Sequence, residues 1–323
     1  MATYKEIFGT NIEVVASDPA NPVTGQVWYN STDNVVKGFA ITTAGAWATG
    51  GNLNTARNSL GGTGTQTAAL AIGGQLPGPS ALTELYNGAS WTEVNDLNTA
   101  RNGVGGFGTS TSSLAYGGEG SAPNPKNITE SWNGTSWTEV NDLNHTGKYV
   151  GRAGTDNTAG LSVTGIGPDN VTPVANVESW NGTSWTEVND VNTARDNLGG
   201  SGTSTAALAF GGTPPPKANT ELWNGTTWTE VNDLNTARYS GASASQNSTS
   251  TFYAGGAIPT TAATEIWNGT SWTEDGDLNT ARDAVAGAGT ATAGIAFAGS
   301  GPTAATEEFT GAGSPTTVTF TDS

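Results

Sequence analysis

Short apolar runs alternate with glycine-rich and polar stretches along this chain, and the alternation recurs. Ser113–Tyr116 is an apolar run closed by two glycines, and a loop leads from it to Thr129–Trp132. The turn Asn133-Gly134 then leads to a further run, Ser136–Val140. Runs of this length, rich in aromatic and β-branched residues, predict β-strands. Asn-Gly between two such runs is a strong hairpin signal, because both residues accept a positive φ.

The phrase Leu-Asn-Thr-Ala-Arg, or a variant of it, marks the same point of this pattern six times. Successive copies are 43 to 48 residues apart, and a period near 45 is typical of a four-stranded propeller blade. We therefore predict an all-β propeller of six four-stranded blades, with seven as the alternative. The repeats begin near Leu53, Leu97, Leu143, Val191, Leu234 and Leu278.

The two ends of the chain bear on how the ring closes. Val35–Phe39 and Gly45–Thr49 look like one more outer hairpin ahead of the first repeat. This pair either completes a closing blade with C-terminal strands or caps a ring that Thr317–Phe320 closes. Closure of some kind is expected because it removes exposed strand edges. We predict an N-terminal attachment or assembly segment, 1–34, and a propeller, 35–323.

Aromatic residues recur in the outer strands of each repeat, and glycines recur in the strand that we place nearest the axis. Small residues let inner strands approach closely, whereas large rings fill the wider space between blades. We expect the repeated arginines to pair with acids such as Glu93 and Asp96. Those acids also offer oxygen ligands for Ca²⁺, although nothing resembles a defined calcium loop. The residues given a structural role are Trp91, Trp137, Trp185, Trp228, Trp272, Arg57, Arg101, Arg195, Arg238 and Arg282.

The repeats resemble the kelch repeat. They share a glycine pair after an apolar strand, an aromatic residue about a dozen positions on, a tryptophan five later, and a link ending in arginine. The resemblance extends from Asn52 to about Phe309 and implies a kelch-like propeller. The third repeat has Val163–Gly167 in place of the glycine pair, and the sixth has Phe309 without a following tryptophan. These two blades are expected to be irregular.

The charge of the chain limits its partners. With 11 Lys and Arg against 28 Asp and Glu, the formal net charge is −17, which repels nucleic-acid phosphates and anionic membranes. The absence of cysteine excludes disulfides and thiolate metal sites. No signal peptide or membrane-spanning run is recognisable, so we expect synthesis in the host cytoplasm, no Sec-type export and no membrane insertion.

The sequence contains few residues that could form a catalytic site. The single histidine, His145, has no nucleophile or second ligand beside it in the sequence, so we predict no catalytic residue, metal or cofactor. The copper chemistry of kelch-fold oxidases needs Tyr, His and Cys together. A sialidase-like carbohydrate-active enzyme is retained as an alternative, because Thr-Ser-Trp near a turn faintly resembles the Asp-box, but its Asp and Gly are missing at the required offsets.

The loops between the second and third strands of each repeat, called here the b–c loops, differ while the other turns are nearly copied. In a propeller these loops emerge on one face, and proline reduces the entropy that they lose on binding. We interpret them as a recognition surface, with unconstrained drift as the alternative. The candidate binding residues are Pro77, Pro79, Pro123, Lys126, Asp169, Pro173, Pro215, Lys217 and Pro259.

The N-terminal run Gly25–Thr32, Gly-Gln-Val-Trp-Tyr-Asn-Ser-Thr, resembles segments of virion and tail-fibre proteins of marine tailed bacteriophages. The resemblance implies attachment through Trp28 and Tyr29; an ordinary hairpin packed on the propeller is the alternative. We hypothesise a non-enzymatic virion protein, a fibre, receptor-binding or capsid-surface component. Its expected partners are other virion proteins and a host-surface glycan or protein, and a homo-oligomer is a further option. A cellular kelch-type interaction module is the main alternative.

Overall fold

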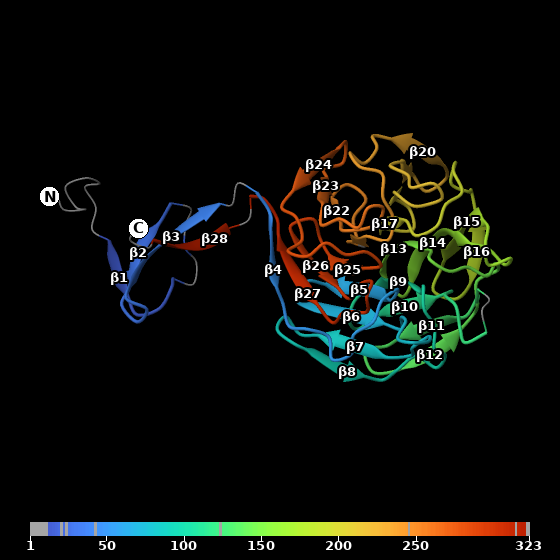
Figure 1. Cartoon of the computed structure of the whole chain (residues 1–323), viewed down its shortest axis with the longest axis horizontal. Helices are drawn as coiled ribbons and strands as arrows, with labels where there is room; N and C mark the ends of the chain where they lie inside the picture. Colours follow the sequence, from blue (N-terminus) through green and yellow to red (C-terminus); the bar gives the residue numbers. More distant parts are fainter. Residues whose placement is uncertain are drawn as a thin grey trace. The chain divides into compact units, whose positions relative to one another are not determined.

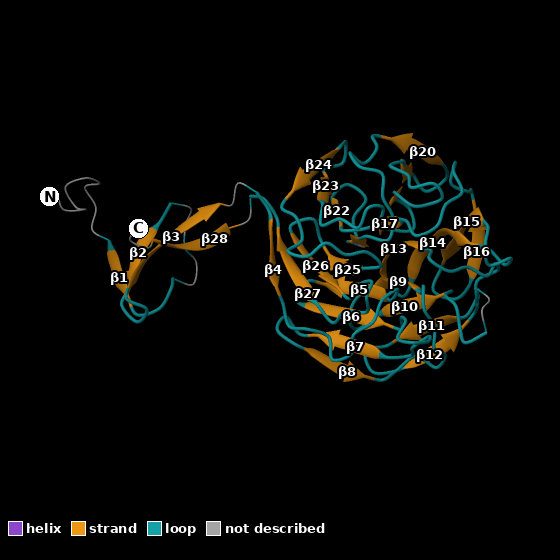
Figure 2. Cartoon of the chain, in the orientation of Figure 1, coloured by secondary structure: helices purple, strands orange, loops and turns teal. Residues whose placement is uncertain are grey.

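The computed structural model describes residues 12–19, 22, 25–41, 44–122, 125–244, 246–313 and 315–320. These residues form strands and loops without any helix, so there is also no helix that could span a membrane in the described ranges (Figure 2). The strands make seven four-stranded sheets. The chain divides into two compact units, a smaller one of Met1–Gly45 with Gly311–Ser323 and a larger one of Ala46–Thr310.

Six sheets belong to the larger unit, and in five of them the chain order runs from the innermost strand outward. Sheet I consists of β5 (Gly61–Thr65), β6 (Ala68–Ile72), β7 (Thr83–Tyr86) and β8 (Trp91–Val94). Sheet II consists of β9 (Gly105–Gly108), β10 (Ser113–Tyr116), β11 (Thr129–Trp132) and β12 (Trp137–Val140). Sheet III consists of β13 (Gly151–Asp156), β14 (Ala159–Ile166), β15 (Pro173–Trp180) and β16 (Trp185–Val188).

The other three sheets repeat this order. Sheet IV consists of β17 (Gly199–Gly202), β18 (Ala207–Phe210), β19 (Thr220–Trp223) and β20 (Trp228–Val231). Sheet V consists of β21 (Ala242–Ser243), β22 (Thr251–Ala254), β23 (Thr264–Trp267) and β24 (Trp272–Asp275). Sheet VI consists of β25 (Ala286–Gly289), β26 (Ala293–Phe297), β27 (Thr306–Thr310) and, from before the first repeat, β4 (Ala46–Thr49).

The innermost strands contact one another in the closed cycle β5, β9, β13, β17, β21, β25 and back to β5, which makes the larger unit a ring (Figure 1). The chain is therefore a β-propeller. The prediction of six four-stranded sheets is nevertheless wrong, because the residues that the structure describes form seven. The additional sheet belongs to the smaller unit and consists of strands from both ends of the sequence.

That sheet has the order β1 (Glu13–Val15), β2 (Val27–Asn30), β3 (Val35–Ile41) and β28 (Pro315–Phe320). The pair β1 and β2 is parallel and the other pairs are antiparallel. The predicted boundary at residue 34 is therefore misplaced, because β3 pairs with β2 and β28 rather than with any strand of the ring. Neither predicted mode of closure is right in full, since β4 alone enters the ring and the C-terminal strand closes the smaller sheet.

Strand β4 replaces what the sixth repeat lacks. It pairs with β27, so that Trp47 lies opposite Phe309. Sheet VI thereby gains the tryptophan that its own repeat does not encode. The expected irregularity of the third repeat is also present, as register shifts in β13 and β14. The two-residue strand β21 in sheet V is an irregularity that the sequence pattern did not predict.

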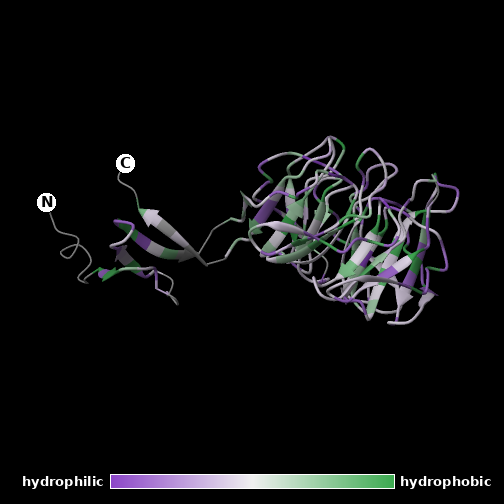
Figure 3. Ribbon diagram, turned by 90° about the horizontal axis from the view of Figure 1, so that it is seen from below, coloured by the Kyte–Doolittle hydropathy of each residue, from purple (hydrophilic) through white to green (hydrophobic). Residues whose placement is uncertain are grey.

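Hydrophobic side chains fill the spaces between neighbouring sheets. The buried residues of the ring form six clusters, each containing side chains from two adjacent sheets. Figure 3 shows the apolar residues along the strands and many of the hydrophilic residues in the loops. Burial of this kind is the dominant favourable contribution to folding. No sheet hides its aromatic residues alone, so the ring is stable only as a whole.

Each outermost strand of the ring has a buried tryptophan at its first or second position, and the indole Nε1 donates a hydrogen bond to the preceding sheet or to the link that follows it. For five of these tryptophans the acceptor is the hydroxyl of the threonine that begins the third strand of the preceding sheet. The pairs are Trp91 with Thr306, Trp137 with Thr83, Trp185 with Thr129, Trp272 with Thr220 and Trp47 with Thr264. In sheet III Val177 occupies this position and has no hydroxyl, so Trp228 donates to the carbonyl of Asn189 instead. The predicted tryptophans thus lie in the core.

The Asn-Gly hairpins differ from the two-residue turn that their sequence indicates. Trp132 pairs with Trp137, which leaves a four-residue loop between them. Gly134 has a φ of 92°, but Asn133 does not have a positive φ. The Oδ1 of Asn133 instead accepts hydrogen bonds from the backbone N–H groups of Thr135 and Ser136, both at 2.9 Å. Asparagine is required here for its side-chain acceptor.

Candidate functional site

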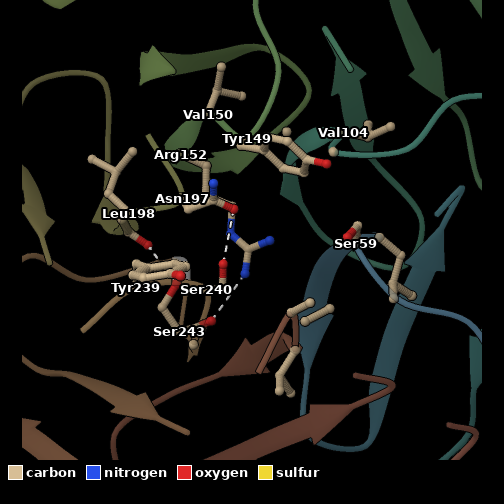
Figure 4. Close-up of a pocket in the computed structure, with 18 residues that line it drawn as sticks. Ser59, Val104, Tyr149, Val150, Arg152, Asn197, Leu198, Tyr239, Ser240 and Ser243 are labelled. Carbon is tan, nitrogen blue, oxygen red and sulfur yellow. Dashed lines mark hydrogen bonds between the residues drawn. The ribbon is translucent and has the colours of Figure 1, made fainter. Parts of the chain in front are cut away.

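A pocket of about 320 Å³ lies on the axis of the ring, at the end where the links from the outer strands enter the inner strands (Figure 4). All six entering links and five of the six innermost strands contribute to its lining, since the first repeat supplies only the link residues Ser59 and Leu60. In the other repeats the lining residues come from the end of the link and the start of the innermost strand. The sequence analysis did not identify this site.

Six residues at equivalent positions form the rim of the pocket, and they all have φ between 52° and 62°. Non-glycine residues adopt this left-handed conformation rarely, and it is often found at functional sites. The rim residues are Ser59, Gly103, Tyr149, Asn197, Ser240 and Ala284.

Backbone hydrogen bonds join the rim residues into a closed cycle. The N–H groups of Gly103, Tyr149, Asn197 and Ser240 each donate to the carbonyl of the preceding rim residue, at 2.8 to 2.9 Å. Ser59 N–H donates to Ala284 at 3.4 Å, and Val285 N–H donates to Ser240 at 3.3 Å. The rim is therefore held by its main chain, and the side chains of these residues are not needed to form the cycle.

Arg152 lies at the second position of the innermost strand of sheet III and lines the pocket (Figure 4). The equivalent residue is glycine in four of the other ring sheets and Ser243 in the fifth. Its Nη2 donates to the carbonyls of Ser243 and Gly287 at 3.1 and 2.9 Å, on the far side of the axis. Its Nε has no partner. Burial lowers the pKa of Arg152 to about 10, so the side chain is still charged at neutral pH.

The backbones of the inner strands approach so closely that side chains have little room there. A Cβ on Gly200 would lie 2.5 Å from the carbonyl oxygen of Arg152, and one on Gly62 would lie 2.7 Å from that of Gly287. Glycine is needed at these positions because only hydrogen fits between the strands. At the position of Arg152 the side chain instead extends into the pocket.

The other five of the six arginines each pair with a buried glutamate in the third strand of the same sheet. Arg101 Nη2, for example, is 2.8 Å from Glu130 Oε1, and both side chains are fully buried. Burial lowers the pKa of Arg101, and the negative charge of Glu130 opposes this effect. The five pairs are Arg57–Glu84, Arg101–Glu130, Arg195–Glu221, Arg238–Glu265 and Arg282–Glu307.

The predicted partners of these arginines were therefore wrong. Asp96 instead accepts a hydrogen bond from the backbone N–H of Thr83 at 3.0 Å, and the equivalent aspartates of sheets II, IV and V do the same. The correct partner follows a threonine in the recurring Thr-Glu pair of the third strand, a signal that the sequence contained. The described residues hold no group of three or more His, Asp or Glu side chains placed to bind a metal ion.

The repeated phrase surrounds each buried glutamate. Asn98 donates to Glu130 Oε2 through its backbone N–H at 2.7 Å and its Nδ2 at 2.8 Å. In the third repeat Gly147 occupies the position of the arginine. Glu178 there accepts from the backbone of Asn144 and His145, and His145 Nδ1 lies 3.6 Å from Glu178 Oε1.

The b–c loops begin beside the rim of the pocket. In five repeats the residue before the rim residue forms a bridge at the end of the second strand or the start of the b–c loop, as in Asn58 with Gln75 and Asp196 with Thr213. The other three bridges join Asn102 to Glu119, Lys148 to Ile166 at the end of β14, and Tyr239 to Ala257. The variable loops and the mouth of the pocket therefore lie at the same end of the ring.

The predicted binding residues that the structure describes lie on these loops, except Pro173, which begins β15, and none of them lines the pocket. Pro77, Asp169, Pro215 and Pro259 are exposed, whereas Pro79, Lys126, Pro173 and Lys217 are half-buried. Pro123 lies outside the described residues. Two large hydrophobic side chains on the same loops are exposed, Val171 at 76% and Ile258 at 64%.

The predicted attachment residues lie in the smaller unit. Trp28 is completely buried, so it is a core residue of that sheet and does not present a docking surface. Tyr29 is half-buried, and its hydroxyl donates to Asn34 Oδ1 at 3.2 Å. Among the described residues of this unit, the exposed large hydrophobic side chains are Val14 at 67% and Phe320 at 54%.

Asp18 makes the stability of the smaller unit depend on pH in the acid range. Hydrogen bonds from Lys37, Asn30 and Trp28, in this order of effect, lower the pKa of Asp18 from 3.8 to about 2. Because the folded-state pKa lies below the unfolded value, the ionised carboxylate stabilises the fold above that value, and the contribution is lost as the pH falls from about 4 to about 2.

We expect the indole N–H resonance of Trp28 to shift over this pH range in an NMR titration of the full chain. Asp18→Asn removes the titrating group, so the shift should vanish in that variant. The same acid response in both proteins would show that another group is responsible.

Comparisons with known proteins establish the fold alone. No protein-family model and no curated protein matches the sequence. A solved structure titled "Structure of YjhT" is similar, with a TM-score of 0.65 and 11% sequence identity, over 80% of this chain and 95% of the other. This similarity supports the β-propeller fold. It gives no support to the narrower kelch and phage resemblances.

Proposed function

We propose that the chain is a non-enzymatic recognition protein whose propeller presents a binding face and whose smaller unit attaches it to a larger assembly. One observation carries this proposal: the axial pocket and all the variable loops lie at the same end of a ring whose other repeat positions are nearly identical. Binding residues are often placed on loops that a rigid scaffold positions. We therefore assign ligand recognition to this end of the ring, and we propose that the ring is a kelch-like propeller.

The exposed side chains on the b–c loops support recognition. Val171 and Ile258 are large hydrophobic residues that remain mostly exposed at this end of the ring. Burying such side chains against a partner contributes favourable free energy, about 25 cal/mol for each Å² of apolar surface. Prolines on neighbouring loops reduce the entropy that would be lost on binding.

The chemistry of the pocket supports binding rather than catalysis. Its lining residues include no carboxylate and no histidine. Burial raises the pKa of Tyr149, the rim tyrosine, so it stays protonated and is a poor nucleophile or base. The arginine cluster that a sialidase-like enzyme would need is also not formed at the pocket, because the other five arginines are paired with glutamates below it.

The smaller unit has features of an attachment module. Its edge strands are β1 and β28, and within the described residues neither pairs with a further strand on its outer side. These same strands carry the exposed Val14 and Phe320. An open edge with exposed apolar side chains can accept another strand by β-augmentation. With the resemblance of Gly25–Thr32, we propose a phage particle as the assembly, and a host-surface glycan or protein as the ligand.

Two matched variants separate attachment from recognition. A chain of residues 46–310 retains every strand of the six ring sheets, so it should fold as judged by circular dichroism. It should bind host cells but not enter particles assembled in its presence. The full chain with Val171→Ser and Ile258→Ser should enter particles but bind cells at least ~10-fold more weakly.

Opposite outcomes contradict specific parts of the proposal. Particles that lack the full-length protein would overturn the virion assignment. Incorporation of the 46–310 chain would overturn the role of the smaller unit, and undiminished cell binding by the loop variant would overturn the role of the b–c loops.

A further inference from the structure

We propose that the axial pocket binds a small carboxylate of about monosaccharide size and that Arg152 holds its carboxylate group. This inference rests on the proposed recognition function and names the class of ligand for one part of the binding face. Its basis is the position, charge and surroundings of Arg152.

The position of Arg152 is the first part of the argument. The glycines at the equivalent positions of sheets I, II, IV and VI leave the centre of the ring without side chains. The Arg152 side chain alone crosses this space, from sheet III to the carbonyls of Ser243 and Gly287 in sheets V and VI. These two bonds fix the guanidinium in the pocket (Figure 4).

The charge of Arg152 is the second part. Every other arginine has a glutamate partner, whereas no ion pair of the described residues includes Arg152. A charge enclosed by protein is costly unless it is paired with an opposite charge or fully hydrogen-bonded. Both hydrogen bonds of Arg152 use Nη2, and Nε has no partner. The guanidinium therefore has donor capacity left for an anion, and arginine matches the geometry of a carboxylate.

The walls of the pocket indicate what the rest of the ligand is like. Hydroxyl and amide groups from Ser59, Asn197 and Ser240 lie on the rim, together with the ring of Tyr149. The rest of the lining combines apolar side chains such as Leu60 and Leu198 with the polar Arg152 and Ser243. A volume of about 320 Å³ is at the small end of ligand pockets. These features fit a hydroxylated ring that carries one carboxylate.

The charge of the whole protein restricts the ligand further. At −17 the chain repels anions at long range, and the repulsion grows with the charge of the ligand. Near the mouth, Lys148 is paired with Glu119, and burial raises the pKa of Asp196. A small ion with a single charge is therefore favoured over a polyanion.

Isothermal titration calorimetry on the full-length protein tests the proposal. The ligand is D-glucuronate, and D-glucose is the matched neutral sugar. We expect glucuronate to bind at least ~10-fold more tightly than glucose, since only glucuronate pairs with Arg152. Arg152→Gly introduces the residue that four equivalent strands already have, and it should weaken glucuronate binding at least ~10-fold. Arg152→Lys should retain part of the affinity.

The control is Lys37→Ala, which changes the net charge by the same amount but lies in the smaller unit, outside the pocket lining and the b–c loops. It should leave glucuronate binding unchanged. Melting temperatures show whether each variant is folded, and Arg152→Lys keeps the test decisive if Arg152→Gly does not fold. Equal binding of the two sugars, binding unaffected by either Arg152 variant, or no glucuronate binding up to ~10 mM would overturn the proposal.

A third ligand, inorganic phosphate, identifies another source of negative charge. Binding of phosphate but not of glucuronate would reject the carboxylate and assign an inorganic anion to Arg152. The inference and the proposed function fail separately. If glucuronate does not bind while host cells are still bound through the b–c loops, only the pocket ligand is wrong. If the full-length protein binds neither glucuronate nor host cells, the recognition function is wrong.

Discussion

Arg101→Met should lower the free energy of unfolding by about 3–5 kcal/mol, because it leaves a buried carboxylate without its counter-charge. Glu130 is completely buried, and among the described residues Arg101 alone forms an ion pair with it. The same guanidinium also donates from Nη1 to the carbonyls of Gly117 and Ile128 at 2.7 and 2.8 Å. Urea unfolding followed by tryptophan fluorescence measures the loss.

The third repeat provides a matched control for this prediction. Glu130→Gln should also be strongly destabilising, because it leaves Arg101 buried and unpaired. Glu178→Gln should cost only about 1 kcal/mol, since Gly147 stands where the arginine would be and no buried cation is left behind. The double variant Arg101→Met, Glu130→Gln should lose less stability than the sum of the single variants. Equal losses for Glu130→Gln and Glu178→Gln would contradict this account.

Trp47→Ala should destabilise the ring by about 3–5 kcal/mol and weaken its closure selectively. The indole packs against Phe309 at 5.0 Å and Phe252 at 5.7 Å between ring centroids, and its Nε1 donates to Thr264. Strand β4 is the only strand of sheet VI that is not continuous in sequence with its neighbours, so side chains and ladder hydrogen bonds hold it in place. Hydrogen exchange should show β27 and β4 losing protection together.

Trp137→Ala is the control for closure. Trp137 occupies the equivalent position in sheet II, where all four strands follow one another in the chain. Its loss should destabilise the ring by a similar amount without selective exchange in β27. An identical exchange pattern in the two variants would show that β4 has no special part in closure. Trp47→Phe should retain most of the packing and lose mainly the hydrogen bond to Thr264, about 1 kcal/mol.

The repeated part of the fold was predictable because each repeat carries its own complete set of signals. Glycines, a hairpin turn and an outer tryptophan occur in nearly every copy. A strand that is ambiguous in one repeat can therefore be assigned by comparison with the others. Trp47 shows where this fails. Its repeat is split between the two ends of the sequence, and only the three-dimensional ring brings Phe309 and Trp47 into one sheet.

Features that depend on long-range pairing were not predictable from local sequence. Strand β28 pairs with β3, nearly the whole chain away, and nothing in either segment specifies the other. Arg101 was assigned to acids close to it in sequence, but folding places Glu130 opposite it instead. Arg152 was missed although a signal existed, namely a charged residue where other repeats have glycine. Arg152 lies in the degraded third repeat, where an arginine in place of glycine looks like one more departure from the repeat pattern.

The closed cycle of backbone hydrogen bonds at the rim has an evolutionary consequence. Because amide and carbonyl groups alone make the cycle, it does not depend on which side chains project from Ser59, Tyr149 or Asn197. Mutations there would alter what the opening selects while the toroid beneath stays intact. The opening can therefore change by single substitutions at the rim while the backbone cycle and the sheets below it stay the same.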